Sequence, residues 1–351
     1  MDIVKLDNFL NVYNQPAFRR EQILKAVLQD GAVSFSQIST LGKELREQLE
    51  REIAILPFTV VKVFRSQDGR AFKALLKLSG NSLIETVLIA PKPNQWSACI
   101  SSQVGCAMHC AFCATGKNGF KRNLTVDEIS SQVLFWRQFF RQKKVSGTFS
   151  HLVYMGMGEP LNNWQEVKKS IKWLIDKNLF NFSQRGISVS TAGVTPGIKQ
   201  FADTFNQVNL AISLHFATDE KRSRYMPINQ TYPLTDLAQA LKYYFKKSKR
   251  KVFIEYVMLA GINDEAEDAA GLISYLKSIG RLDMLHVNLI RYNSIGGKFA
   301  SSLKEKVRIF QNKLLSARVP CTIRKSIGDD IKGACGQLAG RRIDKHNNVD
   351  N

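Results

Sequence analysis

The sequence of 351 residues is 44% hydrophobic and 23% charged, which fits two domains or one large domain with an appendage and excludes disordered and collagen-like chains. No apolar run approaches the length of a membrane span and the first residues lack the layout of a signal peptide, so we expect no membrane contact and a cytoplasmic location. Fifty lysines and arginines against thirty acidic residues leave a net charge of +20. This excess favours the hypothesis that the protein binds a polyanion such as nucleic acid over the hypothesis that its basic charge has no function.

The N-terminal part of the chain changes character near residue 56. Residues 1 to about 55 are predicted to be helical, with amphipathic stretches over Pro16–Gln29 and Ser36–Ile53. The next residues predict three short strands with glycines at the turns: Thr59–Val63, Ala71–Leu76 and Ser82–Ile89. We therefore expect a small N-terminal accessory domain of helices and short strands at residues 1–92, a core domain at 93–345 and a tail at 346–351.

From about residue 96 onward, strand-like and helix-like segments alternate. The predicted strands are apolar and β-branched, as in a parallel sheet covered by helices. They are Ser97–Ser102, Leu152–Met155, Ile187–Thr191, Val208–Leu214, Val252–Met258, Leu285–Ile290 and Cys321–Arg324. The predicted helices are Val126–Gln142, Glu166–Lys177, Gly197–Phe205, Leu234–Lys247, Glu265–Ile279 and Leu303–Ala317. The expected fold class is α/β, with six strand–helix units forming an incomplete (β/α)6 TIM-like barrel.

Polar and glycine-rich segments follow directly after several of these strands. They are Gly156–Pro160, Ser190–Gly193, Ser213–His215 and Arg291–Asn293. The carboxyl ends of parallel barrel strands share one face, and active sites lie on that face. The sequence therefore predicts one site built from these segments.

Four of the six cysteines lie within fifteen residues, and three of them form a C-x3-C-x2-C pattern at Cys106, Cys110 and Cys113. Three thiolates on a short loop can bind three irons of a [4Fe–4S] cluster and leave the fourth iron open. The alternative is zinc with His109 as a fourth ligand. Zinc sites usually combine two paired knuckles, and no second knuckle is present, so the spacing favours iron–sulfur.

At this point the sequence resembles a known family. The cysteine pattern with Phe112 before its last cysteine, in the loop after the first barrel strand, is similar to the radical S-adenosylmethionine (SAM) signature. Further motifs resemble the RlmN/Cfr methyltransferases of 23S rRNA over about residues 80 to 340, whereas the N-terminal module fits only loosely. These motifs are Cys99–Cys106, Phe112–Gly116, Gly156–Leu161, Ser213–His215, Met226–Asn229, Val287–Ile290, Gly328–Asp330 and Ala334–Gly340.

The resemblance implies a radical SAM barrel, a [4Fe–4S] cluster held by Cys106, Cys110 and Cys113, and two SAM molecules per turnover. By the same resemblance, Gly158 and Glu159 hold the amino group of SAM, since a carboxylate accepts hydrogen bonds from an ammonium. The remaining SAM contacts that it implies are Ser190, Ser213, Leu214, His215 and Asn293.

Three further residues match catalytic positions of the family. Cys335 matches the cysteine that a first SAM methylates and that then forms a covalent adduct with adenine. Cys99 matches the partner that closes a disulfide with Cys335 and releases the product, after which cellular thiols reduce the pair. Glu85 matches the proposed acceptor of the adenine proton, although a glutamate in a strand more often faces solvent. Without the resemblance, each lone cysteine would be read as a small buried residue.

The family also implies the partners: 23S rRNA, with the adenosine 3′ of the tRNA anticodon as a second candidate substrate, and an electron donor such as flavodoxin or ferredoxin. It suggests a monomer, with an N-terminal module that contacts RNA. Three basic stretches fit phosphate contacts around the site: Lys242–Lys251, Arg137–Lys144 and Lys117–Arg122. We expect the target adenine to be flipped or unpaired.

Pro160 after Glu159 and the stretch Arg324–Asp330 resemble the branch that methylates carbon 2 of adenine, while Ser294–Lys298 departs from the family pattern. The competing hypotheses are carbon-8 methylation of the same adenosine, a radical SAM enzyme for a small molecule, and a non-catalytic zinc-dependent RNA-binding protein.

Overall fold

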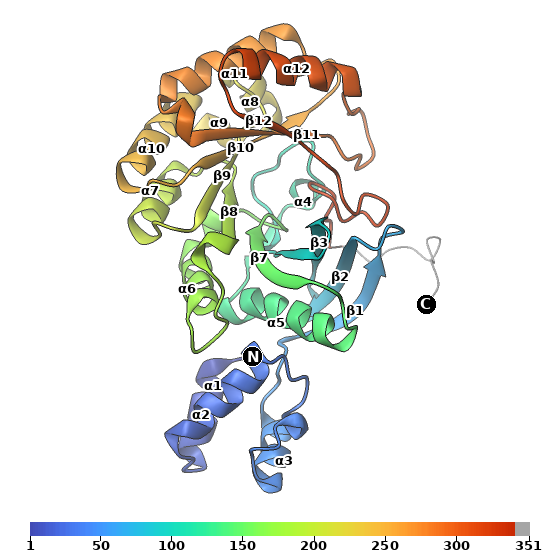
Figure 1. Ribbon diagram of the computed structural model, residues 1–351, viewed down its shortest axis with the longest axis vertical. Coiled ribbons are helices and arrows are strands. Elements are labelled where there is room, and N and C mark those ends of the chain that lie inside the picture. Colours follow the sequence, from blue (N-terminus) through green and yellow to red (C-terminus); the bar gives the residue numbers. More distant parts are fainter. Residues whose placement is uncertain (341–351) are drawn as a thin grey trace.

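The computed structural model describes residues 1–340, and its largest feature is a curved sheet with helices on its outer side (Figure 1). Within these residues the sheet has ten strands in the order β1-β2-β3-β4-β7-β8-β9-β10-β11-β12. Neighbours from β4 to β12 are parallel. These strands are β4 (Gln95–Cys99), β7 (Thr148–Tyr154), β8 (Ile187–Thr191), β9 (Asn209–Ser213), β10 (Val252–Met258), β11 (Leu285–Arg291) and β12 (Cys321–Arg324).

A helix follows each parallel strand except β12, so six strand–helix units are followed by one further strand. The helices are α5 (Val126–Gln142), α6 (Trp164–Ile175), α7 (Thr195–Thr204), α10 (Leu234–Lys247), α11 (Ala266–Ile279) and α12 (Lys304–Ser316). Two shorter helices, α8 (Asp219–Tyr225) and α9 (Ile228–Thr231), lie between β9 and α10. This arrangement confirms the predicted α/β class and the incomplete barrel.

Three antiparallel strands extend the barrel sheet at the edge formed by β4. They are β1 (Phe58–Arg65), β2 (Ala71–Leu78) and β3 (Leu83–Lys92), and β3 pairs with β4 so that Val87 lies opposite Cys99. The accessory strands and the barrel therefore share one sheet. The domain boundary at residue 92 falls in the turn between β3 and β4 and stays a prediction; residues 341–345 of the expected core and the tail at 346–351 lie outside the described residues.

The first 55 residues form helices α1 (Ile3–Val12), α2 (Ala17–Leu24) and α3 (Lys43–Glu52) and lie beside the barrel near α5 (Figure 1). The amphipathic stretch predicted over Ser36–Ile53 is not one helix. A 3-10 turn at Phe35–Gln37 buries Phe35, and α3 begins only after Gly42. No helix among residues 1–340 is long and apolar enough to cross a membrane.

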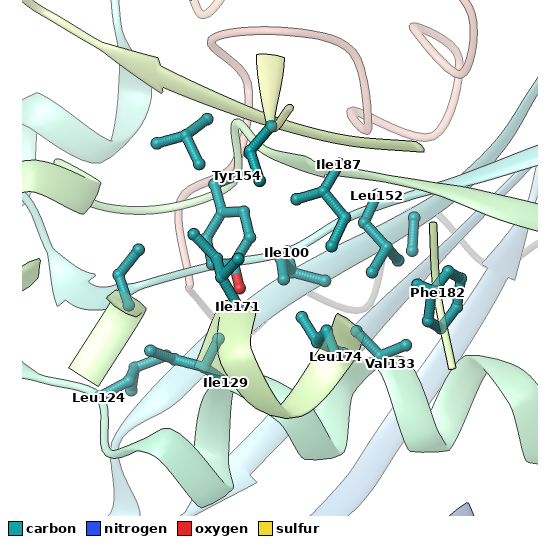
Figure 2. Packing of buried hydrophobic residues seen from close by; sticks show 14 of the residues in the cluster. Ile100, Leu124, Ile129, Val133, Leu152, Tyr154, Ile171, Leu174, Phe182 and Ile187 are labelled. Carbon is teal, nitrogen blue, oxygen red and sulfur yellow. The ribbon is translucent and has the colours of Figure 1, made fainter. Parts of the chain in front are cut away.

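The main hydrophobic core fills the space between the sheet and its outer helices. Figure 2 shows Ile129 and Val133 of α5 with Ile171 and Leu174 of α6 close to Leu152 and Ile187 of the strands. In the same layer the Tyr154 hydroxyl is 2.7 Å from the Ser170 hydroxyl, so its buried oxygen has a hydrogen-bond partner. Because close-packed interiors deform little, this layer holds the carboxyl ends of the strands in fixed positions.

Candidate functional site

The three clustered cysteines lie on a loop closed at its base by a small hairpin. Strand β5 (Gln103–Gly105) pairs with β6 (Phe120–Asn123), and the short helix α4 (Ala114–Lys117) lies between them. The amide of Cys106 donates to the carbonyl of Gly119 at 2.9 Å. Gly105 has φ +76°, and a Cβ at this position would lie 1.8 Å from the Gly119 oxygen, so only glycine permits this closure.

The cysteine loop belongs to a second, smaller cluster of buried apolar residues that includes Cys106, Met108 and Phe112. The pKa of the Cys106 thiol is raised to about 12, mainly by burial and in part by the nearby Glu159 and Cys113. Burial also raises the pKa of Cys110 well above its usual value, with contributions from Cys113 and Cys106. The three thiols therefore lie within electrostatic reach of one another. Phe112 packs edge-on against His215, with ring centroids 5.1 Å apart, and also contacts Phe216.

The residue types of this loop, three cysteines in an apolar setting, fit the requirements of a [4Fe–4S] cluster. Among residues 1–340, no three histidine, cysteine or acidic side chains are grouped to hold one metal ion, and this includes the set with His109. In a cubane, each cysteine binds a different iron, so the thiols need not converge on one point. The soft thiolate donors and the apolar lining are the surroundings that such a cluster requires.

Gly158 and Glu159 follow β7 at the same face. Gly158 has φ +99°, and an added Cβ would lie 2.5 Å from the Cβ of Gln103. The carboxylate of Glu159 accepts from the amides of Leu161 at 3.0 Å and Ala192 at 2.7 Å. Burial raises the pKa of Glu159 to about 7, although these two hydrogen bonds oppose the shift. An incoming cation would favour the ionised carboxylate.

The other expected SAM contacts gather around the ends of β8 and β9. The hydroxyls of Ser190 and Ser213 are 3.3 Å apart. Leu214 is fully buried, and His215 adopts φ +59° with its Nδ1 accepting from the Val257 amide at 3.1 Å. Burial, helped by the charge of Arg222, lowers the pKa of His215 to about 3, so its imidazole is neutral at physiological pH.

Cys335 lies on an irregular segment, residues 328–340, which we term the Cys335 segment. Its backbone is bound to the cysteine loop: Ala114 N donates to Gly336 O at 2.8 Å, and the Thr115 hydroxyl donates to Leu338 O at 2.6 Å. The side chain of Asn293 donates to the carbonyl of Cys335 at 3.1 Å. The structure therefore brings Cys335 and Asn293 to the edge of the cysteine loop, and Cys335 itself is exposed.

Cys99 ends β4 next to this segment. Burial raises the pKa of the Cys99 thiol strongly, and the neighbouring Cys335 thiol adds to the shift. Both cysteines are free thiols in this structure. Cys321, in β12, is half-buried and packs against the main core.

Glu85 is buried in β3, contrary to the usual placement of a strand glutamate. Its Oε1 is 2.9 Å from the Nζ of Lys73, and its Oε2 accepts from the amides of Ala339 at 2.6 Å and Gly340 at 3.0 Å. Glu85 thus contacts the Cys335 segment directly, four residues after Cys335.

Sequence reasoning missed three buried polar residues of this region. Lys73 is one; Arg222 is another, fully buried and bonded to Asn229 and to the carbonyls of Ala192 and Leu214. The third is Glu255 in β10, whose carboxylate accepts from Asn288 at 2.8 Å. The available signals were an acidic residue within an apolar strand and an arginine just before the Met226–Asn229 motif.

Two of the three basic stretches do not surround the site. Lys242–Lys251 and Arg137–Lys144 precede β10 and β7, which places them at the amino ends of these strands, opposite the cysteine loop. Arg137 is moreover bonded to the carbonyls of Leu28 and Phe180. In the third stretch Arg122 forms a bidentate pair with Glu128, whereas Lys117 and Lys121 are exposed beside the cysteine loop.

Two family models match the chain: the radical SAM superfamily at residues 100–273 and the ribosomal RNA large subunit methyltransferase N-terminal domain at residues 1–55. The second match extends the resemblance to the N-terminal helices, which the sequence motifs fit only loosely.

Relatives match over nearly the whole chain. The chain is 38% identical to "Ribosomal RNA large subunit methyltransferase Cfr" of Shouchella clausii, covering 96% of this chain and 95% of the relative. It is 40% identical to "Probable dual-specificity RNA methyltransferase RlmN" of Chlorobium phaeobacteroides, covering 96% and 93%. A crystal structure of a radical SAM methyltransferase from Sphaerobacter thermophilus is 35% identical, with a TM-score of 0.90 and coverage of 97% and 98%.

Proposed function

The chain belongs to the RlmN/Cfr family of radical SAM rRNA methyltransferases, and we propose that it methylates carbon 2 of an adenosine in 23S rRNA at the peptidyl transferase centre. The observation that supports this most is the position of Cys335. Its segment is bonded to the cysteine loop through Ala114 and Thr115, and its thiol lies near that of Cys99. A radical SAM enzyme for a small molecule would not need this second pair of cysteines.

Members of this family use a [4Fe–4S] cluster and SAM. We propose Cys106, Cys110 and Cys113 as the cluster ligands. When bound, the cluster supplies the electron that cleaves SAM and so opens a radical route to an adenine carbon that is too electron-poor to attack a methyl group directly. Gly158, Glu159, Ser190, Ser213, Leu214, His215 and Asn293 would bind and orient SAM.

The two cysteines outside the loop divide the transfer between them. Cys335 would accept a methyl group from one SAM. Cleavage of a second SAM would remove one hydrogen atom from that methyl group, and the remaining methylene would bond to the adenine carbon and join the protein to the RNA. The Cys99 thiol would attack the Cys335 sulfur, forming a disulfide and breaking the bond between that sulfur and the methylene carbon. The thiol proton would complete the methyl group, the adenine proton would pass to Glu85, and the one surplus electron would return to the cluster. Burial keeps Cys99 protonated at rest, which limits premature disulfide formation.

Glu85 is the proposed acceptor of the proton that leaves the adenine carbon. A carboxylate has about four lone-pair sites, and the Ala339 and Gly340 amides occupy the two on Oε2. The Lys73 ammonium occupies one on Oε1. The remaining lone pair of Oε1 is therefore the site where Glu85 would take the proton.

Carbon 2 rather than carbon 8 is the finer part of the proposal. It is supported by Pro160 after Glu159 and by the stretch Arg324–Asp330, both of which resemble the carbon-2 branch of the family. Relatives with RlmN and Cfr names are similarly distant from this chain, so carbon-8 methylation is the alternative. The dual-specificity name of one relative supports the adenosine 3′ of the tRNA anticodon as a second substrate. A flavodoxin or ferredoxin as electron donor and a monomeric state are further parts of the proposal.

Covalent trapping tests the proposed transfer. We expect Cys99→Ala, incubated with SAM, reductant and a 23S rRNA fragment, to accumulate a protein–RNA adduct on a denaturing gel, because no thiol remains to release Cys335. Cys99→Ala combined with Cys335→Ala should give no adduct, and Cys321→Ala should turn over like the unmodified protein. If the Cys99→Ala variant forms no adduct, Cys99 is not the releasing residue.

A further inference from the structure

Lys73 is buried to an unusual degree for a lysine: only 2% of its surface is exposed, and it lies on β2 between β1 and β3. Lysine is almost never fully buried unless it is paired. Burying an ion pair costs desolvation free energy that the attraction between the charges often fails to recover, so stability alone does not explain it. The partners of its ammonium therefore indicate its role.

The ammonium of Lys73 connects β2 to both flanks of Cys335. It lies 2.9 Å from Glu85 Oε1 and donates to the carbonyl of Lys332 at 3.3 Å, while its remaining side faces the ring of Phe64 at 5.3 Å. Glu85 in turn accepts from the amides of Ala339 and Gly340 through Oε2. One buried charge thus holds residue 332 directly and residues 339–340 through Glu85.

The Cys335 segment is consequently held from two sides. The cysteine loop binds it through Ala114 and Thr115, and the accessory strands bind it through Lys73 and Glu85. Near its start, Gly328 packs against Ala71 of β2, because a Cβ there would lie 2.9 Å from the Ala71 side chain. Among these contacts, those of Lys73 and Glu85 are the charged ones, and charge-assisted hydrogen bonds are the stronger kind.

We propose that Lys73 is a positioning residue that holds the Cys335 segment in place for methyl transfer, acting through Glu85 and the Lys332 carbonyl. This inference rests on the proposed role of Cys335 as the methyl carrier. It gives the accessory strands a function in the reaction, because β2 and β3 would hold Cys335 in a fixed position relative to the cysteine loop.

The test compares Lys73→Met with Lys77→Met in the cluster-loaded protein under anaerobic conditions. Lys77 is exposed on the same strand and serves as the matched control. Amide hydrogen exchange should accelerate roughly tenfold or more in peptides covering residues 332–340 of Lys73→Met and stay unchanged elsewhere, since local opening is read by local exchange. Mass spectrometry after incubation with SAM should show roughly tenfold less methylated Cys335 in Lys73→Met, while its affinity for SAM is preserved. Lys77→Met should behave like the unmodified protein in both measurements.

Unchanged exchange at residues 332–340 would overturn the inference, and so would acceleration spread over β2 and β3, which would indicate a purely structural role. If Lys73→Met does not fold, the double variant Lys73→Met/Glu85→Gln removes both buried charges and should fold, with the same local acceleration. If the unmodified protein itself carries no methyl on Cys335, the proposed function fails, while the exchange result still decides whether Lys73 holds the segment.

Discussion

Glu159 and His215 show how burial sets the charge of individual site residues. Burial raises the pKa of Glu159 to about 7 and lowers that of His215 to about 3. At neutral pH the carboxylate is therefore close to its titration midpoint, while the imidazole is neutral. A neutral His215 can accept at Nδ1, as it does from Val257, and donate at Nε2.

These pKa values predict the pH dependence of SAM binding. The proposed partner of the SAM ammonium is the ionised form of Glu159, which becomes populated as the pH rises through about 7. Affinity should therefore rise by up to about tenfold per pH unit below 7 and level off above it. Isothermal titration of the cluster-loaded protein between pH 6 and 8 measures this.

The Glu159→Gln variant provides the control for the pH profile. It should bind SAM roughly ten- to a hundredfold more weakly at pH 8, which corresponds to the loss of a hydrogen bond to a charged group, and its affinity should not change with pH. If the SAM affinity of Glu159→Gln still changed with pH, the titrating group would be a residue other than Glu159.

At the scale of elements, the strands of the barrel could be predicted from the sequence, whereas the hairpin of β5 and β6 at the base of the cysteine loop could not. The segments 187–191, 252–258 and 321–324 match strands β8, β10 and β12, because segments that contain β-branched residues and lie between turn signals are strong strand patterns. Strands β5 and β6 have three and four residues and no periodicity. Their pairing depends on a backbone contact between Gly105 and Gly119, which is a tertiary property.

Replacing Gly105 with alanine should disrupt this hairpin. The added Cβ would collide with the Gly119 carbonyl and would also have to adopt φ +76°. We expect a cost of about 1 to 3 kcal/mol or more in stability of the loop and a several-fold lower iron content after reconstitution. Iron analysis with thermal unfolding measures both.

Gly119→Ala is the matched control for this hairpin variant. Gly119 has a similar φ of +67°, yet a Cβ would meet nothing within 4 Å. Its effect should be limited to about 1 to 2 kcal/mol of backbone strain, with near-normal iron content. Equal losses of iron in both variants would show that the close contact does not matter.

At the scale of the whole molecule, the sequence predicted the net charge but not its distribution. The stretch Lys242–Lys251 looked like a phosphate-binding surface, yet the sheet places it at the amino end of β10. The same holds for the ion pair between Lys73 and Glu85, which depends on strand register that periodicity does not specify. By contrast, motifs local in sequence, such as Cys106–Cys113, could be identified directly.

The location of the basic residues predicts which of them bind RNA near the site. Lys117→Gln/Lys121→Gln should weaken binding of a 23S rRNA fragment and flatten the dependence of log K on log salt by about one to two, since each lost phosphate contact removes released counterions. The control Lys246→Gln/Lys249→Gln alters two exposed lysines at the opposite end of the barrel and removes the same charge. Methylation by this control should be normal, and equal defects in both variants would indicate a non-local effect of charge.

Nucleoside mass spectrometry tests the central claim most directly. The cluster-loaded protein would be incubated with SAM, a reductant and an unmodified 23S rRNA fragment, and the digested RNA would be compared with that from Cys335→Ala. We predict 2-methyladenosine from the unmodified protein and none from the variant. 8-Methyladenosine would contradict the carbon-2 assignment, and SAM cleavage without any methylated adenosine would contradict RNA methylation itself.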